Sequence, residues 1–390
     1  MVKNRKTYDN NWPIVAICYD FDKTLSPKDM QNFGLIPKLG CKVAAFWRAS
    51  NKLAKERGMD KILAYMKLII DNAELQNQTI TRADFNELGK TIELFKGVES
   101  WFERVNAIAS ELKINVEHYI ISAGIKEIIE GTSIAQYFTE IYASEFYYDQ
   151  NGKPVWPCQV VNYTSKTQYL FRINKDCLDL SDEESVNDYI PDSSRRIPLK
   201  HFIYIGDSET DIPAMKIVKQ GGGFSIGVYN PKSCNIEKVT NLLQQERIDF
   251  LMPANYTEGS KIEQTVESIL KKIRSNHDLS ELNKAQKNFV SDLEKVDNFI
   301  SYTDKYLSDS EISTTESNKT EKQSKRVLKK IKKDLLNEHS NVVGELEIET
   351  FMKKKEKQVT SLFAGKRKEI QKSKLKNSKK AKTAKNTTKA

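Results

Sequence analysis

The sequence has few of the cysteines that a disulfide framework or a zinc site requires. Its 390 residues contain five, an odd number, and no two of them form a CxxC pair. Disulfide-rich and zinc-stabilised domains use even, regularly spaced sets. We therefore expect reduced thiols, as in a cytoplasmic protein. The five are Cys18, Cys41, Cys158, Cys177 and Cys234.

The sequence also lacks a long hydrophobic run. Residues 1–12 are mostly polar or charged, and the apolar segment that follows, residues 14–18, is far shorter than a signal peptide or a spanning helix. This absence excludes a transmembrane segment within the chain. We expect a protein of the cytoplasm.

Acidic residues are scarce only at one end of the chain. Residues 320–390 contain 22 Lys and Arg against 8 Asp and Glu, a net charge of +14, so 40 minus 45 leaves −5 for the other residues. From Lys366 to Ala390 there are 11 basic residues and one Glu, which predicts a disordered, solvated tail. The alternative is that the tail binds nucleic acid or an anionic surface.

Four short apolar runs indicate buried strands of a parallel sheet. Each ends at a polar residue, and helical patterns at residues 98–112 and 125–129 separate some of them. Alternation of buried strands with helices is typical of a doubly wound α/β fold. The predicted strands are residues 14–19, 118–121, 141–143 and 201–205.

The chain also contains helical segments outside this sheet. The stretch after the first strand shows helical spacing and no strand pattern, so it predicts an inserted helical cap. Residues 261–307 have 4-3-4 apolar steps, which indicate a coiled-coil-like extension and possible self-association. The predicted parts are a catalytic core at 12–27 and 97–254, the cap at 28–96, an amphipathic helical segment at 255–307, a linker at 308–320, and a Lys-rich helical, then disordered, tail at 321–390.

Two aspartates directly follow the first predicted strand. Asp20 and Asp22 stand two residues apart, at the strand end where open α/β sheets bind ligands. Paired carboxylates there are costly unless they bind a cation or take part in chemistry. Divalent metals prefer oxygen ligands, and a carboxylate can accept a phosphoryl group. The alternative is a pair of turn aspartates that cap a helix.

A second acidic cluster follows the last predicted strand. Asp207 and Asp211 lie in the segment Gly206-Asp207-Ser208-Glu209-Thr210-Asp211. Parallel strands share a carboxyl edge, so the side chains of Asp20 and Asp207, with the backbone carbonyl of Asp22, could hold one Mg²⁺ ion. For Asp211 the alternative is an acid at a helix N-terminus.

Two further segments could hold a phosphate group. Ser122, Ala123 and Gly124 follow the second predicted strand, where a hydroxyl and backbone amides at a helix start would form an anion site. The alternative for Ser122 is a simple N-cap. Lys166 could supply positive charge to a transferring phosphoryl group, although it could equally be a surface lysine, with Lys175 in its place.

Taken together, these residues resemble a known family. Asp20-x-Asp22-x-Thr24, Ser122, Lys166 and Gly206-Asp207-x-x-x-Asp211, in this order, are similar to the four motifs of the haloacid dehalogenase superfamily. The resemblance implies that Asp20 is the nucleophile and Asp22 the general acid and base. It implies that Ser122 and Lys166 orient the phosphoryl group and that the late acids serve Mg²⁺, with Thr24 and Asp211 as supporting residues.

The resemblance also bears on the reaction. An acid at position 22 points to phosphate chemistry, because dehalogenating members lack one there and ATP-driven pumps have Thr. The inserted cap resembles that of phosphoserine phosphatase-like members, whereas Ser208 stands where glycine is common. We expect a phosphatase that acts on a small phosphorylated substrate through an aspartyl-phosphate. The alternatives are a phosphomutase, a polynucleotide end-phosphatase that uses the basic tail, and an inactive scaffold.

Overall fold

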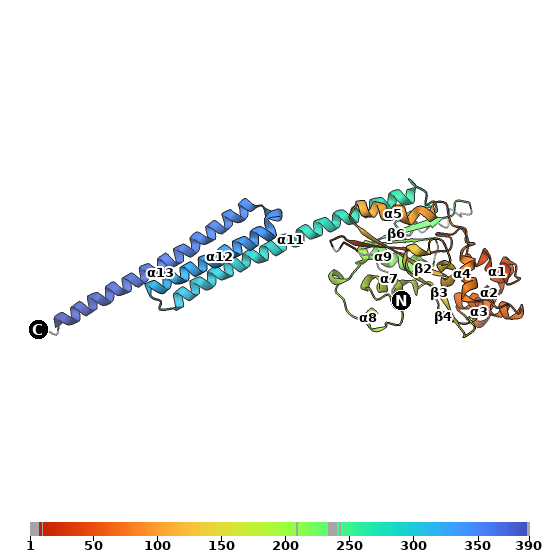
Figure 1. The fold of residues 1–390 in the computed structure, drawn as a ribbon, viewed down its shortest axis with the longest axis horizontal. Helices are drawn as coiled ribbons and strands as arrows, with labels where there is room; N and C mark the ends of the chain where they lie inside the picture. Colours follow the sequence, from red (N-terminus) through yellow and green to blue (C-terminus); the bar gives the residue numbers. More distant parts are fainter. Residues whose placement is uncertain (1–7, 10, 208–209, 233–239, 242, 388–390) are drawn as a thin grey trace. The chain divides into compact units, whose positions relative to one another are not determined.

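The computed structural model describes residues 8–9, 11–207, 210–232, 240–241 and 243–387, with side chains as far as residue 379. The chain forms two compact units, Met1–Ser275 and Asn276–Ala390 (Figure 1). The first contains the sheet, and the second is helical.

The first unit is built on one sheet of seven strands, which confirms the predicted α/β class. The order is β4-β3-β2-β1-β5-β6-β7, and every adjacent pair is parallel except β3 with β4. The strands are β1 (Ile14–Tyr19), β2 (Asn115–Ile125), β3 (Phe138–Tyr148), β4 (Pro154–Gln159), β5 (Phe202–Gly206), β6 (Phe224–Tyr229) and β7 (Phe250–Pro253).

Strand β1 shows why the apolar runs form the centre of this sheet. Its side chains alternate between two cores, with Val15 and Ile17 in one and Ala16 and Cys18 in the other. Because both faces are covered, each residue must be apolar. Helix α5 (Val98–Glu111) and the first turns of α11 (Lys261–Asp309) cover one face; α7 (Lys166–Lys175) and α9 (Ile212–Gln220) cover the other.

The segment between β1 and α5 is helical, as the apolar spacing predicts. It packs through residues such as Tyr65 and Phe85 against the same core as the sheet. Its elements are η1 (Met30–Asn32), α1 (Leu35–Lys38), α2 (Val43–Arg57), α3 (Lys61–Leu75) and α4 (Arg82–Gly89). The short elements between β2 and β5 are α6 (Lys126–Glu130), η2 (Ala135–Tyr137), α8 (Glu184–Asn187), η3 (Asp192–Ser194) and η4 (Leu199–His201).

The second unit is a bundle of three helices. The later part of α11 packs with α12 (Thr314–Val343) and α13 (Glu345–Thr387) around a core of its own (Figure 1). Val296 and Ile300, two apolar residues of the predicted coiled coil, lie in that core with Leu328 and Phe363. No helix in the described part of the chain combines the length and apolar character needed to cross a membrane.

The structure corrects two predictions near the C-terminus. Residues 314–320, predicted as linker, are the first turns of α12, because Ser313 and Glu316 form a capping box that starts a helix there. Residues 366–387, predicted as disordered, belong to α13. Lys and Ala are good helix formers, so a high net charge did not prevent a helix.

The structure also extends the predicted strands. β2 continues through Ile125, and a register shift lies between Ser122 and Ile125. Ser122, Ala123 and Gly124 therefore form the end of a strand rather than the start of a helix. Strands β4, β6 and β7, which were not predicted, are short runs of four to six residues.

Candidate active site

The two acidic clusters meet at the carboxyl edge of the sheet. β1 and β5 are parallel neighbours, and Asp20 and Asp207 follow their last residues. The backbone N–H of Asp20 donates to the carbonyl of Ile205 at 2.9 Å, so the strand pairing continues up to the first aspartate. One carboxylate oxygen each of Asp20, Asp207 and Asp211 lie within 4.8 Å of one another, and this group could hold a metal ion.

Lys166 lies among these carboxylates. Its buried ammonium Nζ is 2.7 Å from Asp211 Oδ1 and 3.2 Å from Asp20 Oδ1. Burial opposes the charge, but the two carboxylates raise the pKa of Lys166 above its ordinary value, so it stays protonated. Lys175, the alternative from the sequence, instead donates to the carbonyls of Val186 and Asp188.

Asp211 is held in place from two sides. In addition to Lys166, the hydroxyl of Tyr204 donates to Asp211 Oδ1 at 2.9 Å. A Cβ atom on Gly206 would lie 2.7 Å from Asp211 Cγ, so the absence of a side chain there allows the close approach. Tyr204 was not predicted as a site residue. Its place on β5, two residues before Gly206, was the only signal for it.

Asp22 occupies the turn after β1, beside the cap. Its Oδ1 accepts the backbone N–H of Met30 at 2.8 Å. Burial, followed by the charges of Asp29 and Asp20, raises the pKa of Asp22 well above its usual range. A Cβ atom on Gly124 would lie 3.3 Å from Asp22 Oδ2, which places the end of β2 next to this carboxylate.

The predicted phosphate-binding residues lie at this end of β2. Ser122 is buried, its hydroxyl lowers the pKa of Asp20, and it accepts the backbone N–H of Gly124 at 3.2 Å. The carbonyl of Ala123 accepts the hydroxyl of Tyr65, a residue of cap helix α3, at 2.7 Å. The cap therefore contacts the segment that the sequence predicts as a phosphate site. Nothing in the sequence spacing identified Tyr65.

Thr24 lies in the turn that follows β1. It is fully buried, and its carbonyl accepts the hydroxyl of Tyr256 at 2.8 Å. Its own Oγ1 has no hydrogen-bond partner among the described residues. Ser208 and Glu209, the other members of the second acidic cluster, lie outside the described residues.

The charges of the site do not balance. Among the described residues, the carboxylates of Asp20, Asp22, Asp207 and Asp211 converge near one buried ammonium, that of Lys166, and the exposed ammonium of Lys23 pairs with Asp29. Burial raises the pKa of Asp20 to about 6, although Lys166 lowers it. Burial, with Asp20 and Asp211 nearby, raises the pKa of Asp207 well above its usual range. A divalent cation would relieve this repulsion, and an all-oxygen donor set fits a hard ion such as Mg²⁺.

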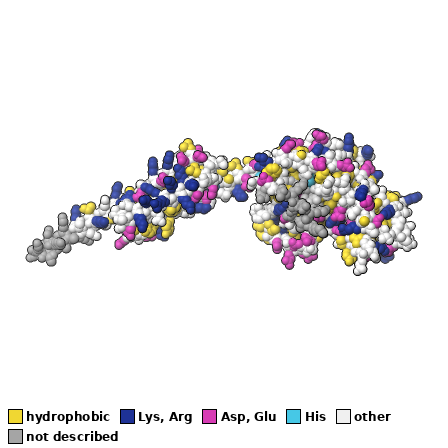
Figure 2. All heavy atoms as spheres, in the orientation of Figure 1, with side chains coloured by type: hydrophobic (Ala, Val, Ile, Leu, Met, Phe, Trp, Pro, Cys, Tyr) yellow, Lys and Arg dark blue, Asp and Glu magenta, His cyan; other side chains and the backbone are white. Residues whose placement is uncertain are grey.

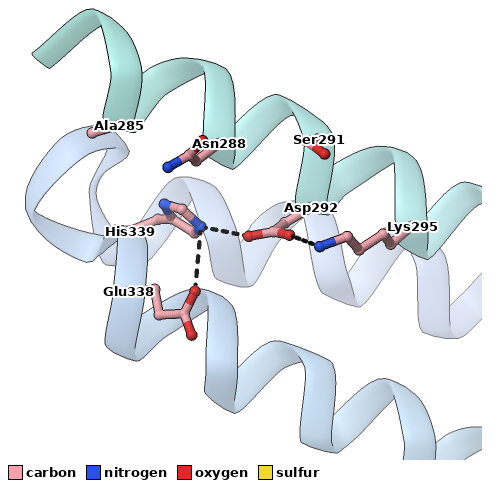
Figure 3. Close-up of a pocket in the computed structure, with 7 residues that line it drawn as sticks. All are labelled: Ala285, Asn288, Ser291, Asp292, Lys295, Glu338 and His339. Carbon is pink, nitrogen blue, oxygen red and sulfur yellow. Dashed lines mark hydrogen bonds and ion pairs between the residues drawn. The ribbon is translucent and has the colours of Figure 1, made fainter. Parts of the chain in front are cut away.

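A second group of possible metal ligands lies in the helical unit. Asp292, Glu338 and His339 line a surface pocket of about 400 Å³ (Figure 3). His339 Nε2 lies 2.9 Å from Asp292 Oδ2, and the ammonium of Lys295 lies 2.6 Å from Asp292 Oδ1. Lys295 would compete with a metal ion for Asp292, so we interpret this group as an ion-pair cluster.

A doubly wound α/β domain with an inserted helical cap and an acidic carboxyl edge is the arrangement that the resemblance in the sequence implies. The family comparison agrees. The model of the haloacid dehalogenase-like hydrolases matches residues 17–216, about half of the chain, and the chain belongs to this family.

Individual proteins are similar to the chain over most of their length. An uncharacterized protein of Borreliella burgdorferi is 29% identical over 278 residues, which cover 64% of this chain and 94% of that protein. A haloacid dehalogenase family hydrolase from Salmonella enterica serovar Typhi is 15% identical with a TM-score of 0.43, covering 65% of this chain and 74% of its own. A probable phosphoserine phosphatase from Vibrio cholerae is 12% identical with a TM-score of 0.43, covering 69% and 68%.

Proposed function

We propose that the protein is a magnesium-dependent phosphatase that hydrolyses a small phosphomonoester through an aspartyl-phosphate on Asp20. The observation that carries the proposal is the position of Lys166, which contacts both Asp20 and Asp211 inside the carboxylate group. A buried ammonium beside a carboxylate nucleophile can stabilise negative charge on a transferring phosphoryl group.

The first step would form the covalent intermediate. A carboxylate oxygen of Asp20 attacks phosphorus, and the bond from phosphorus to the ester oxygen breaks. Asp22 gives its proton to the leaving oxygen, so an alcohol departs and Asp22 becomes a carboxylate. The hydrogen bond from the Met30 backbone to Asp22 Oδ1 holds this side chain in the turn after β1.

The second step would release phosphate. Asp22 takes a proton from a water molecule, whose oxygen attacks phosphorus, and the bond to Asp20 breaks to regenerate the carboxylate. Lys166, the Ser122 hydroxyl and the backbone amides of Ala123 and Gly124 would hold the phosphoryl oxygens through both steps. The effect of the Ser122 hydroxyl, which lowers the pKa of Asp20, supports this placement.

Magnesium fits the residues present. The side chains of Asp20 and Asp207 and the backbone carbonyl of Asp22 would hold the ion, with Asp211 fixed behind them by Lys166 and Tyr204. Bound there, Mg²⁺ would screen the charge of the phosphoryl group from the carboxylates. The excess of carboxylates over ammonium groups is the structural reason to expect it.

A phosphomutase would use the same residues and return the phosphoryl group to the substrate. The two functions differ in their products, because only a phosphatase releases inorganic phosphate in proportion to substrate consumed.

The test is a screen of phosphorylated metabolites with the purified full chain and Mg²⁺, measuring released phosphate. Asp20→Asn should lower turnover at least about 1,000-fold, since an amide cannot form the intermediate. The amide can still accept the Phe21 N–H, which Asp20 Oδ1 accepts at 2.8 Å, so the fold should persist by circular dichroism. Asp71→Asn, the same change at a partly exposed position of cap helix α3, is the matched control. Turnover of Asp20→Asn within about tenfold of the parent would refute the mechanism.

A further inference from the structure

The last part of α13 carries almost only positive charge. Residues 366–387 are helical and contain ten Lys or Arg and one Glu, a net charge of +9. Among the described residues, Phe363 is the last buried apolar residue of the bundle core. Arg367 still forms an ion pair with Glu321 of α12, and the rest of the segment continues past that pair. A helix without tertiary packing is only marginally stable, and lysine repulsion destabilises it further.

Exposed lysines also lie on the bundle itself. They include two groups of three on α12 and α13, two adjacent helices that an ion pair between Lys332 and Glu349 connects. Among the described residues, none of the six has a carboxylate within ion-pair distance, in contrast to the paired Lys355 and Arg367. Figure 2 shows Lys and Arg side chains gathered on the visible face of these helices. The six are Lys329, Lys330, Lys333, Lys353, Lys354 and Lys357.

We propose that this basic surface binds the phosphodiester backbone of a nucleic-acid duplex. The surface consists of these six lysines and of Lys368, Lys372, Lys374 and Lys376 on the end of α13. Each uncompensated lysine can replace a condensed counterion on a phosphate, and release of these ions drives binding. At about 1.5 Å per residue the basic end of α13 is about 33 Å long, comparable to one helical turn of a duplex.

The side chains favour a duplex over the other polyanions. After Phe363 the sequence has no aromatic residue on which an unpaired base could stack, so a single strand would gain little. An amphipathic helix that lies on a membrane needs an apolar face. Between Lys366 and Lys379 only Ile370 and Leu375 have large apolar side chains, and lysines occupy positions around the whole helix. A duplex backbone requires positive charge alone.

The test measures binding of the full chain to a fluorescent 30-base-pair DNA duplex by anisotropy, at several salt concentrations. The quadruple variant K368Q/K372Q/K374Q/K376Q should bind at least about tenfold more weakly at low salt. A plot of log binding constant against log salt concentration should also be less steep, by about 0.9 for each phosphate that a lysine no longer neutralises. The variant K113Q/K200Q/K216Q/K261Q changes the net charge equally but alters exposed lysines of the first unit. It should bind within about twofold of the parent.

Three results would overturn the proposal. One is equal weakening in both variants, which would mean that net charge alone attracts the duplex. A second is tighter binding to the single strand of the same sequence. The third is tighter binding to vesicles that contain phosphatidylserine than to the duplex. The α13 variant should keep the phosphate-release rate of the parent on a small substrate, and this readout is independent of binding.

Discussion

The two units place charge in opposite environments. In the first, the carboxylates of Asp20, Asp207 and Asp211 converge in a largely buried group with one ammonium, that of Lys166. In the second, lysines are exposed along α12 and α13, and many have no carboxylate nearby in the described structure. Buried charges interact strongly and depend on position, whereas exposed charges are screened and act in sum.

This difference determines how each unit should respond to substitution. A change of one buried carboxylate removes a particular interaction that no neighbour can replace. A change of one exposed lysine removes a small share of a diffuse field. Single substitutions should therefore decide the chemistry of the first unit, and only combined substitutions should alter binding by the second.

Among the single substitutions that compare the two units, Asp22→Asn should have the largest effect on activity. With an alkyl phosphate the rate of phosphate release should fall about 100- to 10,000-fold, because the poor leaving group needs a proton. With an aryl phosphate, whose leaving group is stable as an anion, the loss should be much smaller. Asn can still accept the Met30 N–H through Oδ1, so the turn should keep its geometry. Equal losses on both substrates would remove Asp22 from the role of general acid.

The fold of the first unit could be predicted largely because its signals are local. β1 has the predicted bounds, since six consecutive apolar residues end at an aspartate. The approach of Lys166 to Asp20 was suggested by the resemblance to a family. Residue spacing alone could not predict that Lys166 contacts Asp20, because 145 residues separate the two in the sequence.

The contacts of Tyr204 and Tyr65 were not predictable by such means. Each contact depends on the face of the strand or helix from which the tyrosine side chain projects. The sequence does not distinguish a buried tyrosine whose hydroxyl contacts a polar group of the site from one whose hydroxyl does not. The C-terminal helix was missed for another reason. For the end of α13, net charge argued for disorder, whereas the helix propensity of Lys and Ala argued for a helix. The start of α12 had its own signal, the capping box at Ser313 and Glu316.

A second prediction tests whether the bundle is energetically separate from the active site. Leu328 is fully buried in the bundle core, so Leu328→Ala should destabilise the bundle by about 2–5 kcal/mol. Faster hydrogen exchange in α12 and α13, measured by mass spectrometry, would report this loss. Leu346→Ala, at an exposed position of α13, is the control and should change exchange little. Phosphate release on a small substrate should stay within about twofold in both variants, and a loss above about tenfold in Leu328→Ala alone would show that the bundle supports catalysis.

The smallest predicted effect concerns the ion-pair cluster of the bundle, where charge is partly exposed. Asp292 pairs with Lys295 on its own helix and with His339 on α12, and His339 also lies near Glu338 (Figure 3). Hydrogen bonds from Lys295, and then from His339, lower the pKa of Asp292. A carboxyl group whose pKa is lower in the folded state stabilises the fold above its unfolded pKa of about 4, and this contribution is lost as the pH falls through the folded pKa.

Asp292→Asn keeps an acceptor for His339 but removes the charge, so it should destabilise the bundle by less than about 1 kcal/mol at pH 7, and by less still at high salt. Hydrogen exchange in α12, corrected for the intrinsic rate at each pH, should show a difference from the parent at pH 7 that shrinks towards pH 3. Lys295→Gln removes the other charge of the same pair and should give a similar pH dependence. A difference that remains constant from pH 7 to pH 3 would mean that the shape of the side chain, rather than its charge, stabilises this part of the bundle.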